Sequence, residues 1–224
     1  MNSTIPPYPA GVVAAPEPIE RTAFFPGGLG LWMEEHRRVF TFPAGQTMVV
    51  GQDFNTLKTY NCVRKLKSEL NASPTWRALR QVLGVFDIPV ENCFFTNVYM
   101  GLRAIGPETG RFPGARDAAF IDRCIKFFNR QLAVARPKLI LTLGLAPLRA
   151  LGPPLSGIKR PKTLTACDSV FTLDLPHGRT SLVALTHPSM YKRNVVRRRF
   201  AQFAGIEAEK AMVRDARAAA GWRL

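Results

Sequence analysis

The sequence has few cysteines and no long apolar run. Its four cysteines, Cys62, Cys93, Cys124 and Cys167, stand at least 31 positions apart, so no close pair exists to hold zinc or an iron–sulfur cluster from one loop. No stretch approaches the roughly 18 to 20 apolar residues that cross a bilayer. The first twenty residues also lack the basic flank and apolar block of a secretory signal. We therefore expect a cytoplasmic, intracellular protein with reduced thiols and no bound metal.

Acidic residues are also scarce. Only 16 Asp and Glu oppose 31 Lys and Arg, which gives the 224-residue chain a net charge of +15. Because 46% of the residues are hydrophobic, the chain has enough material for a full core, and this excludes a disordered basic tail. So large a positive charge predicts a polyanionic partner, with nucleic acid the first candidate and an anionic membrane surface the second.

The chain divides into an arm and one domain. Residues 1–30 are rich in proline and glycine, which interrupt helices and strand ladders, so they predict an irregular arm that lies on the domain. Residues 31–224 predict a single domain with no internal repeat.

Short apolar runs alternate with segments of helical period in this domain. The runs lie at 47–50, 93–96, 139–143 and 182–185, and each is apolar nearly throughout, as expected for parallel strands that are covered on both faces. The intervening patterns predict helices over 74–83, 115–135 and much of 195–219. A hairpin turn is expected at His177-Gly178. The fold class is therefore α/β.

Polar residues follow the strands where they end. Asp53, Asn97 and His187 each come just after a predicted strand, and the carboxyl ends of parallel strands line one crevice of an open sheet. We expect these three side chains to meet there. They combine a charge, a two-way hydrogen bonder and a group that titrates near neutral pH.

A mixed apolar and basic segment follows His187. Apolar side chains beside cations fit a wedge that enters a base stack while its flanks hold phosphates. The alternative is an ordinary solvated face. The expected DNA-binding residues are Ser189, Met190, Tyr191, Lys192, Arg193, Arg197 and Arg198.

Four blocks in this order resemble the uracil-DNA glycosylase superfamily. They are GQDFN at 51–55, TNVYMGLR at 96–103, IDRCIKFFNRQLAVARPKLILTLGLAPLRAL at 121–151 and THPSMYKRN at 186–194. The likeness spans about residues 45–205 and is closest in block order to the thermophile-type enzymes. It implies a three-layer αβα sandwich with a central four-stranded, mainly parallel sheet. It also implies an enzyme that flips uracil out of DNA and hydrolyses the N-glycosidic bond, with other deaminated bases as alternative substrates.

The resemblance assigns a role to each strand-end residue. Asp53 would position the attacking water and stabilise positive charge on the sugar, and His187 would donate a hydrogen bond to uracil O2 as the base departs. Asn97 would read the base, because its carboxamide matches uracil and mismatches cytosine. Backbone amides near Gln52 would complete the O2 contact, and Phe54 or Trp76 would stack on the flipped ring.

The sequence also departs from the family pattern. The thermophile-type enzymes hold an iron–sulfur cluster on four cysteines, whereas here Gly101 replaces one ligand and only Cys124 falls at a ligand-like place. We expect no cluster and no other cofactor. Asn55 occupies the place of a tyrosine that excludes the thymine methyl, and Tyr191 that of an intercalating leucine.

Two functions remain open at this stage. The first is an active, monomeric glycosylase whose partner is uracil-containing DNA. The second is an inactive, glycosylase-like protein that binds nucleic acid. Asp53 and Asn97 also have ordinary interpretations as a helix cap and a turn residue.

Overall fold

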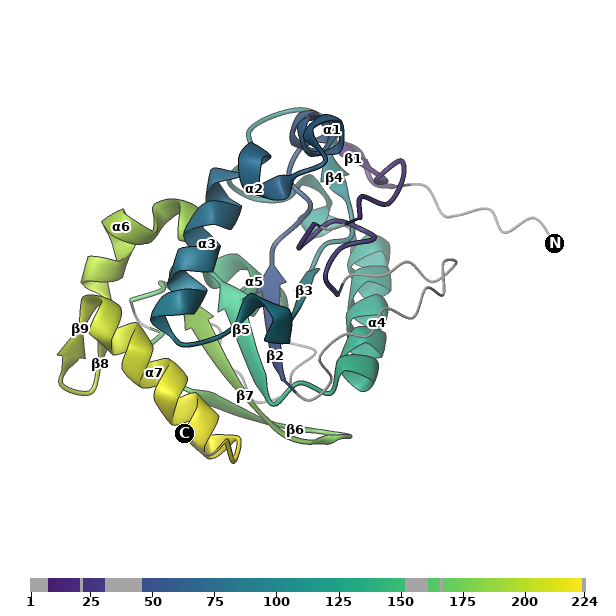
Figure 1. The fold of residues 1–224 in the computed structure, drawn as a ribbon. Helices are drawn as coiled ribbons and strands as arrows, with labels where there is room; N and C mark the ends of the chain where they lie inside the picture. Colours follow the sequence, from purple (N-terminus) through teal and green to yellow (C-terminus); the bar gives the residue numbers. More distant parts are fainter. Residues whose placement is uncertain (1–7, 21, 31–45, 152–160, 166, 223–224) are drawn as a thin grey trace.

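The centre of the molecule is one five-stranded sheet (Figure 1). The computed structural model describes residues 8–20, 22–30, 46–151, 161–165 and 167–222. The strand order is β3 (Cys93–Asn97), β2 (Thr47–Gly51), β5 (Leu139–Leu143), β7 (Gly178–Leu185) and β6 (Phe171–Leu175). The four predicted strands are present and run parallel to one another. Their shared direction brings their carboxyl ends to one edge of the sheet.

The fifth strand runs the other way. β6 pairs with β7 in antiparallel register from Phe171 opposite Leu182 to Leu175 opposite Gly178. The predicted turn at His177-Gly178 is confirmed. Because β6 lies at the sheet edge, its partly exposed residues gave a weaker apolar signal than the central strands.

Helices cover both faces of the sheet, which makes three layers. Met48 and Val50 pack on the side of α4 (Ala118–Ala135) and α5 (Leu145–Leu151). Val49, between them, packs on the side of α3 (Pro74–Val85) and α7 (Gly205–Ala219). Successive residues of a strand face opposite ways, so burial on both sides requires the unbroken apolar runs seen in the sequence.

Side-chain caps set the starts of two predicted helices. Ser73 accepts the Trp76 N–H at 3.1 Å, and Pro74 occupies the first position of α3. Asp117 accepts the Phe120 N–H at 2.7 Å. This cap begins α4 at Ala118 instead of the predicted 115, and the preceding η2 (Pro113–Arg116) is a 3-10 turn.

The last predicted helix is present in the carboxyl-terminal part of its range. It starts at Gly205, and the segment before it folds into short pieces instead of continuing a helix from 195. These pieces are η3 (Pro188–Met190), α6 (Tyr191–Asn194), η4 (Val195–Arg197), β8 (Arg199–Phe200) and β9 (Phe203–Ala204). Ala201 at φ +49° makes the β8–β9 turn, a local geometry that the helical spacing of the apolar residues did not predict.

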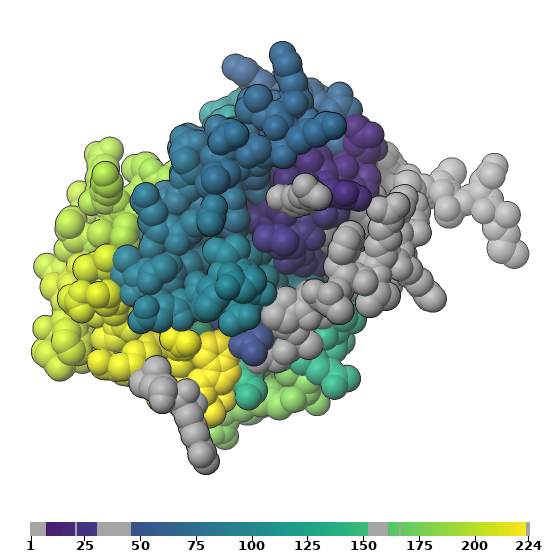
Figure 2. Space-filling view, viewed as in Figure 1, coloured from purple at the N-terminus to yellow at the C-terminus, as the bar shows by residue number. Residues whose placement is uncertain are grey.

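The amino-terminal arm packs on the domain. Its β1 (Val12–Val13) pairs with β4 (Leu102–Arg103), and Ile19 and Phe25 are buried in a cluster with Phe54. Figure 2 shows the arm in purple against the blue segment that holds α1 (Leu57–Leu66), α2 (Glu69–Ala72) and α3. A 3-10 turn, η1 (Val90–Asn92), leads into β3. Among the described residues, no helix is both long and apolar enough to cross a membrane.

Candidate active site

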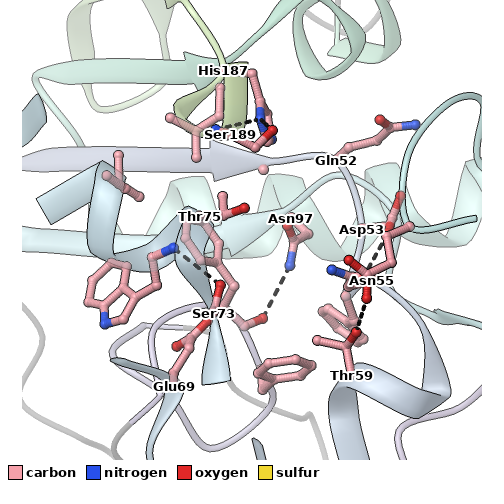
Figure 3. Close-up of a pocket in the computed structure, with 18 of the residues that line it drawn as sticks. Gln52, Asp53, Asn55, Thr59, Glu69, Ser73, Thr75, Asn97, His187 and Ser189 are labelled. Atoms are coloured by element: carbon pink, nitrogen blue, oxygen red, sulfur yellow. Dashed lines mark hydrogen bonds between the residues drawn. The ribbon is translucent and has the colours of Figure 1, made fainter. Parts of the chain in front are cut away.

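A cavity of about 190 Å³ lies at the carboxyl ends of the parallel strands (Figure 3). Asp53, Asn97 and His187 all line it, although they are separated by up to 134 positions of sequence. Gln52 follows β2 into the same cavity. The parallel register explains the meeting, because Gly51 of β2 lies beside Asn97 of β3, and Leu143 of β5 lies beside Leu185 of β7.

A wider groove of about 920 Å³ adjoins this cavity. The two share His187 and Ser189, and the groove extends past Met190 to Arg111 and Arg149. Both arginines are exposed. The small cavity therefore opens onto a larger surface that carries positive charge, which suits a polyanion.

The surroundings of His187 keep its imidazole neutral and fix the position of its proton. Burial lowers the pKa of His187. The Ser189 backbone N–H donates to Nδ1 at 3.3 Å, and the Ser189 hydroxyl lies 2.7 Å from the same atom. A backbone N–H can only donate, so Nδ1 accepts and the ring proton is on Nε2. Gly144, at φ +83°, lets β5 end close to this ring: a Cβ there would lie 3.4 Å from the His187 Cβ.

Asn97 is fixed by the arm and by β2. Its side-chain amide donates to the backbone carbonyl of Phe24 at 3.1 Å. Its Oδ1 lies against Gly51, where a Cβ would come within 2.3 Å of it. A side chain at position 51 would therefore displace the Asn97 carboxamide.

Asp53 forms a buried ion pair that the sequence did not indicate. Its Oδ2 lies 2.9 Å from Nη2 of Arg103, and the two side chains are 6% and 4% exposed. The Asn55 N–H donates to Oδ1 at 2.8 Å. Burial raises the pKa of Asp53, and Arg103 and the Asn55 N–H oppose that rise. Arg103 also donates to the Gly110 carbonyl at 2.9 Å, so it ties the carboxylate to the loop that borders the groove.

The aromatic wall of the cavity includes both predicted rings and a third ring from the arm. Phe54 and Trp76 both border it, but they are only 5% and 8% exposed because they pack into clusters. Phe24 of the arm is the partly exposed ring at this wall. Its centroid lies 5.3 Å from that of Phe95 and 6.4 Å from that of Trp76, both edge to face.

A buried carboxylate holds the arm in place. Glu69 accepts the Ala23 backbone N–H, and its side chain borders the cavity. Burial raises the pKa of Glu69 to about 7, and the backbone N–H groups of Ala23 and Phe24 oppose the rise. This contact joins α2 to the arm at the residue before Phe24.

The basic segment after His187 is only partly as expected. Ser189, Met190, Lys192, Arg193 and Arg197 are exposed, with Met190 at 41%. The inclusion of Arg198 was wrong: it is 1% exposed, its Nε lies 3.1 Å from Glu209 Oε1, and it donates to the Ala184 carbonyl at 2.8 Å. The run of arginines in the sequence does not reveal which one turns inward to meet a buried carboxylate.

Tyr191 also points inward. Its hydroxyl is buried near Glu209, and burial, with the nearby Glu209 carboxylate, raises the pKa of Tyr191. Its ring is partly buried against the core cluster beside α7. The expectation that Tyr191 forms the wedge is therefore wrong. Met190 is the exposed apolar side chain at this turn.

The residues do not fit an iron–sulfur cluster. A Cβ at Gly101 would lie 2.6 Å from Val12 Cγ1, so a cysteine side chain has no space there while the arm is packed. Cys124 is 2% exposed and accepts the Met100 N–H at 3.4 Å within the core. Among the described residues, no group of three or more His, Cys, Asp or Glu side chains is placed to bind a metal ion.

Sequence reasoning missed Arg103, Glu69 and Phe24. Arg103 ends the TNVYMGLR block, but nothing in its neighbourhood marks it as buried. The adjacent aromatics Phe24 and Phe25 in a proline-rich arm were the available signal, because irregular segments seldom carry paired large apolar residues unless they pack on something.

The fold and this cavity define a class: three-layer α/β proteins with a cavity at the carboxyl ends of the parallel strands, which is where open α/β sheets bind ligands. A model of the Uracil DNA glycosylase superfamily matches residues 32–209, and the chain belongs to that superfamily. No curated protein matches the chain. Membership supports a role as a DNA glycosylase, a hydrolase that acts on DNA. The match begins after the described part of the arm, so Phe24 lies outside it.

Proposed function

We propose that this protein removes uracil from DNA by hydrolysing the N-glycosidic bond. The observation that carries the proposal is the shared cavity of Asn97, His187 and Asp53 at the carboxyl ends of the sheet. A flipped uracil presents O2, N3–H and O4 along one edge. Asn97 would match N3–H and O4, and His187 would match O2, which leaves Asp53 for the attacking water.

His187 would stabilise the departing base. Its Nε2–H would donate to uracil O2, where negative charge develops as the glycosidic bond breaks. A neutral imidazole suits this role because its proton stays on the donor, and both burial and the Ser189 N–H at Nδ1 support that state. Backbone amides near Gln52 would add to the O2 contact.

Asp53 would position the attacking water. Each carboxylate oxygen has two lone pairs, so Asp53 retains acceptor capacity beside its bonds to Arg103 and the Asn55 N–H. The ion pair also cancels much of the negative charge that Asp53 would present to a cationic sugar. We therefore propose that it contributes more through water placement than through electrostatic stabilisation.

The groove beside the cavity would hold the DNA strand. Exposed cations at Arg111, Arg149, Lys192, Arg193 and Arg197 would contact phosphates, and Met190 would enter the stack in place of the flipped base. Asn55 lines the cavity, and the family resemblance places it where a tyrosine excludes the methyl group of thymine. Asparagine is smaller than tyrosine, so it would exclude that methyl group less strictly.

The decisive experiment uses oligonucleotides with one uracil, followed by hot alkali, which breaks the strand at an abasic site. We expect strand breaks with the wild-type protein and a loss of about 10²–10³-fold in rate for His187→Ala. The matched control is His177→Ala, because His177 lies at the β6–β7 turn, far from the cavity. Parallel substrates with hypoxanthine, xanthine or thymine opposite guanine define the range of bases.

A second function is supported by one observation, the neutralisation of Asp53 by Arg103. Such a site would bind a flipped base without hydrolysing its glycosidic bond if no other group activates water. Tight binding of uracil-containing DNA with no release of uracil would favour this glycosylase-like binding protein and refute the enzyme.

A further inference from the structure

The reading of uracil by a carboxamide depends on which way the carboxamide points. The oxygen and nitrogen ends of an asparagine side chain have nearly the same shape. One orientation offers an acceptor to N3–H and a donor to O4 of uracil, and the reverse orientation suits cytosine. An Asn97 that turned freely would therefore discriminate poorly between the two bases.

The arm supplies an acceptor that fixes this orientation. The carbonyl of Phe24 can only accept, so the nitrogen end of Asn97, at 3.1 Å, must face the arm. The amide has a second N–H that this bond leaves for a base. At the other end, Oδ1 lies against the backbone of Gly51, where there is no side chain.

The Phe24 carbonyl is itself held in place on several sides. Glu69 accepts the Ala23 N–H. The Leu29 N–H donates to the Thr22 carbonyl at 2.8 Å and the Gly28 N–H to the Phe25 carbonyl at 2.9 Å, which close a tight loop around Phe24. A Cβ at Gly28 would lie 2.5 Å from the Thr22 carbonyl oxygen, so the loop requires glycine there.

We propose that arm residues 22–25, held by Glu69, act as a clamp that orients the Asn97 carboxamide to read uracil. Glu69 and Phe24 are then positioning residues, which act on the base through Asn97. This inference rests on the proposed function and adds to it a specificity device whose arm residues, 22–25, lie outside the segment matched by the family, whereas Glu69 and Asn97 lie within it.

The clamp is tested by its effect on base discrimination. Duplexes that carry 2′-fluoro-2′-deoxyuridine or 2′-fluoro-2′-deoxycytidine at one position resist cleavage, and fluorescence anisotropy gives the ratio of their two dissociation constants. We expect Glu69→Ala to reduce this ratio by about tenfold, the equivalent of one net hydrogen bond. Glu69→Gln keeps a carbonyl acceptor for the Ala23 N–H, so it should retain most of the wild-type ratio of dissociation constants. Glu91→Gln, an exposed acid elsewhere on the chain, leaves it unchanged.

A folded Glu69→Ala protein with the wild-type ratio would overturn the clamp. If Glu69→Ala does not fold, the side-chain ¹⁵N–¹H signals of Asn97 in the free wild-type protein decide. Slow hydrogen exchange of the Asn97 proton that faces the Phe24 carbonyl, with a chemical shift displaced from that of a free asparagine amide, supports a clamped amide. Exchange and shifts like those of a solvent-exposed amide overturn it.

The two proposals fail in different ways. Wild-type protein that releases no uracil refutes the glycosylase function, whereas the amide signals of Asn97 are read without any substrate. Normal uracil release with an unchanged ratio in Glu69→Ala refutes only the clamp.

Discussion

Removing Arg103 should destabilise the protein strongly and in a pH-dependent way. Arg103→Leu leaves the Asp53 carboxylate, only 6% exposed, without its cation partner. Breaking a buried pair by removing one partner costs about 3–5 kcal/mol of the free energy of unfolding. The matched control is Arg64→Leu, because Arg64 pairs with Glu17 at 2.8 Å but both side chains are at least 50% exposed. Such a surface pair contributes about 0–1 kcal/mol.

The pH dependence follows from the sign of the Asp53 shift. Burial already raises the pKa of Asp53 and Arg103 opposes that rise, so removing Arg103 raises this pKa further. A carboxyl group whose pKa is higher in the folded than in the unfolded state binds more protons when folded. Stability then decreases as the pH rises from the unfolded pKa through the folded one. The penalty of Arg103→Leu should therefore be smaller near about pH 5 than near about pH 8.

Urea unfolding followed by circular dichroism at the two pH values measures this effect. The double variant Asp53→Asn with Arg103→Leu should recover part of the stability, since the buried charge is then absent. The reasoning is refuted if Arg103→Leu costs no more than Arg64→Leu, or if its cost is the same at both pH values.

Three further predictions concern the surface and the thiols. Replacing Arg193 and Arg197 with alanine should weaken binding to any DNA sequence and reduce the slope of log K against log salt by about 0.9 for each phosphate that is no longer neutralised. Arg179→Ala, at the β6–β7 hairpin, should leave that slope unchanged, and an unaltered slope in the double variant would show that these arginines face away from DNA. Met190→Ala should slow uracil release from duplex DNA by roughly tenfold and from single strands much less, because only the duplex must be unstacked; equal slowing on both would argue against a wedge. Native protein should react with an aromatic disulfide reagent at Cys62 only, since Cys62 is exposed and the other three cysteines are buried. Rapid reaction of more than one thiol would contradict the packed core around them.

Much of the fold followed from local patterns. The unbroken apolar runs predicted parallel strands with both faces covered, and Ser73-Pro74 predicted the start of α3. The last helix was predicted within residues 195–219, and the structure begins it at Gly205. The local pattern did not give that start: before it, Arg198 is buried against Glu209 and Ala201 makes a turn. A boundary of this kind depends on contacts made in the folded chain.

The cavity itself was partly predictable. Polar residues after apolar strands indicated that Asp53, Asn97 and His187 would meet, because parallel strands bring their carboxyl ends together whatever the connecting segments are. This rule about parallel strands does not predict whether a given side chain points into the cavity, into the core or to the surface. Tyr191 and Met190 are neighbours in sequence, yet the Tyr191 ring is partly buried against the core and the Met190 side chain is exposed.

The amino-acid sequence alone predicted parallel strands covered on both faces, the basic character and the meeting of three polar side chains, because periodicity and charge are properties of the chain itself. The tertiary structure decided the electrostatic state of the site. Arg103 pairs with Asp53, and the Ser189 N–H decides which nitrogen of His187 carries the proton. The Phe24 carbonyl holds the Asn97 amide. Apart from Ser189, these partners come from other segments of the chain, and a hydrogen bond or ion pair acts only over a few ångströms, so folding has to bring the two groups together before either contact exists.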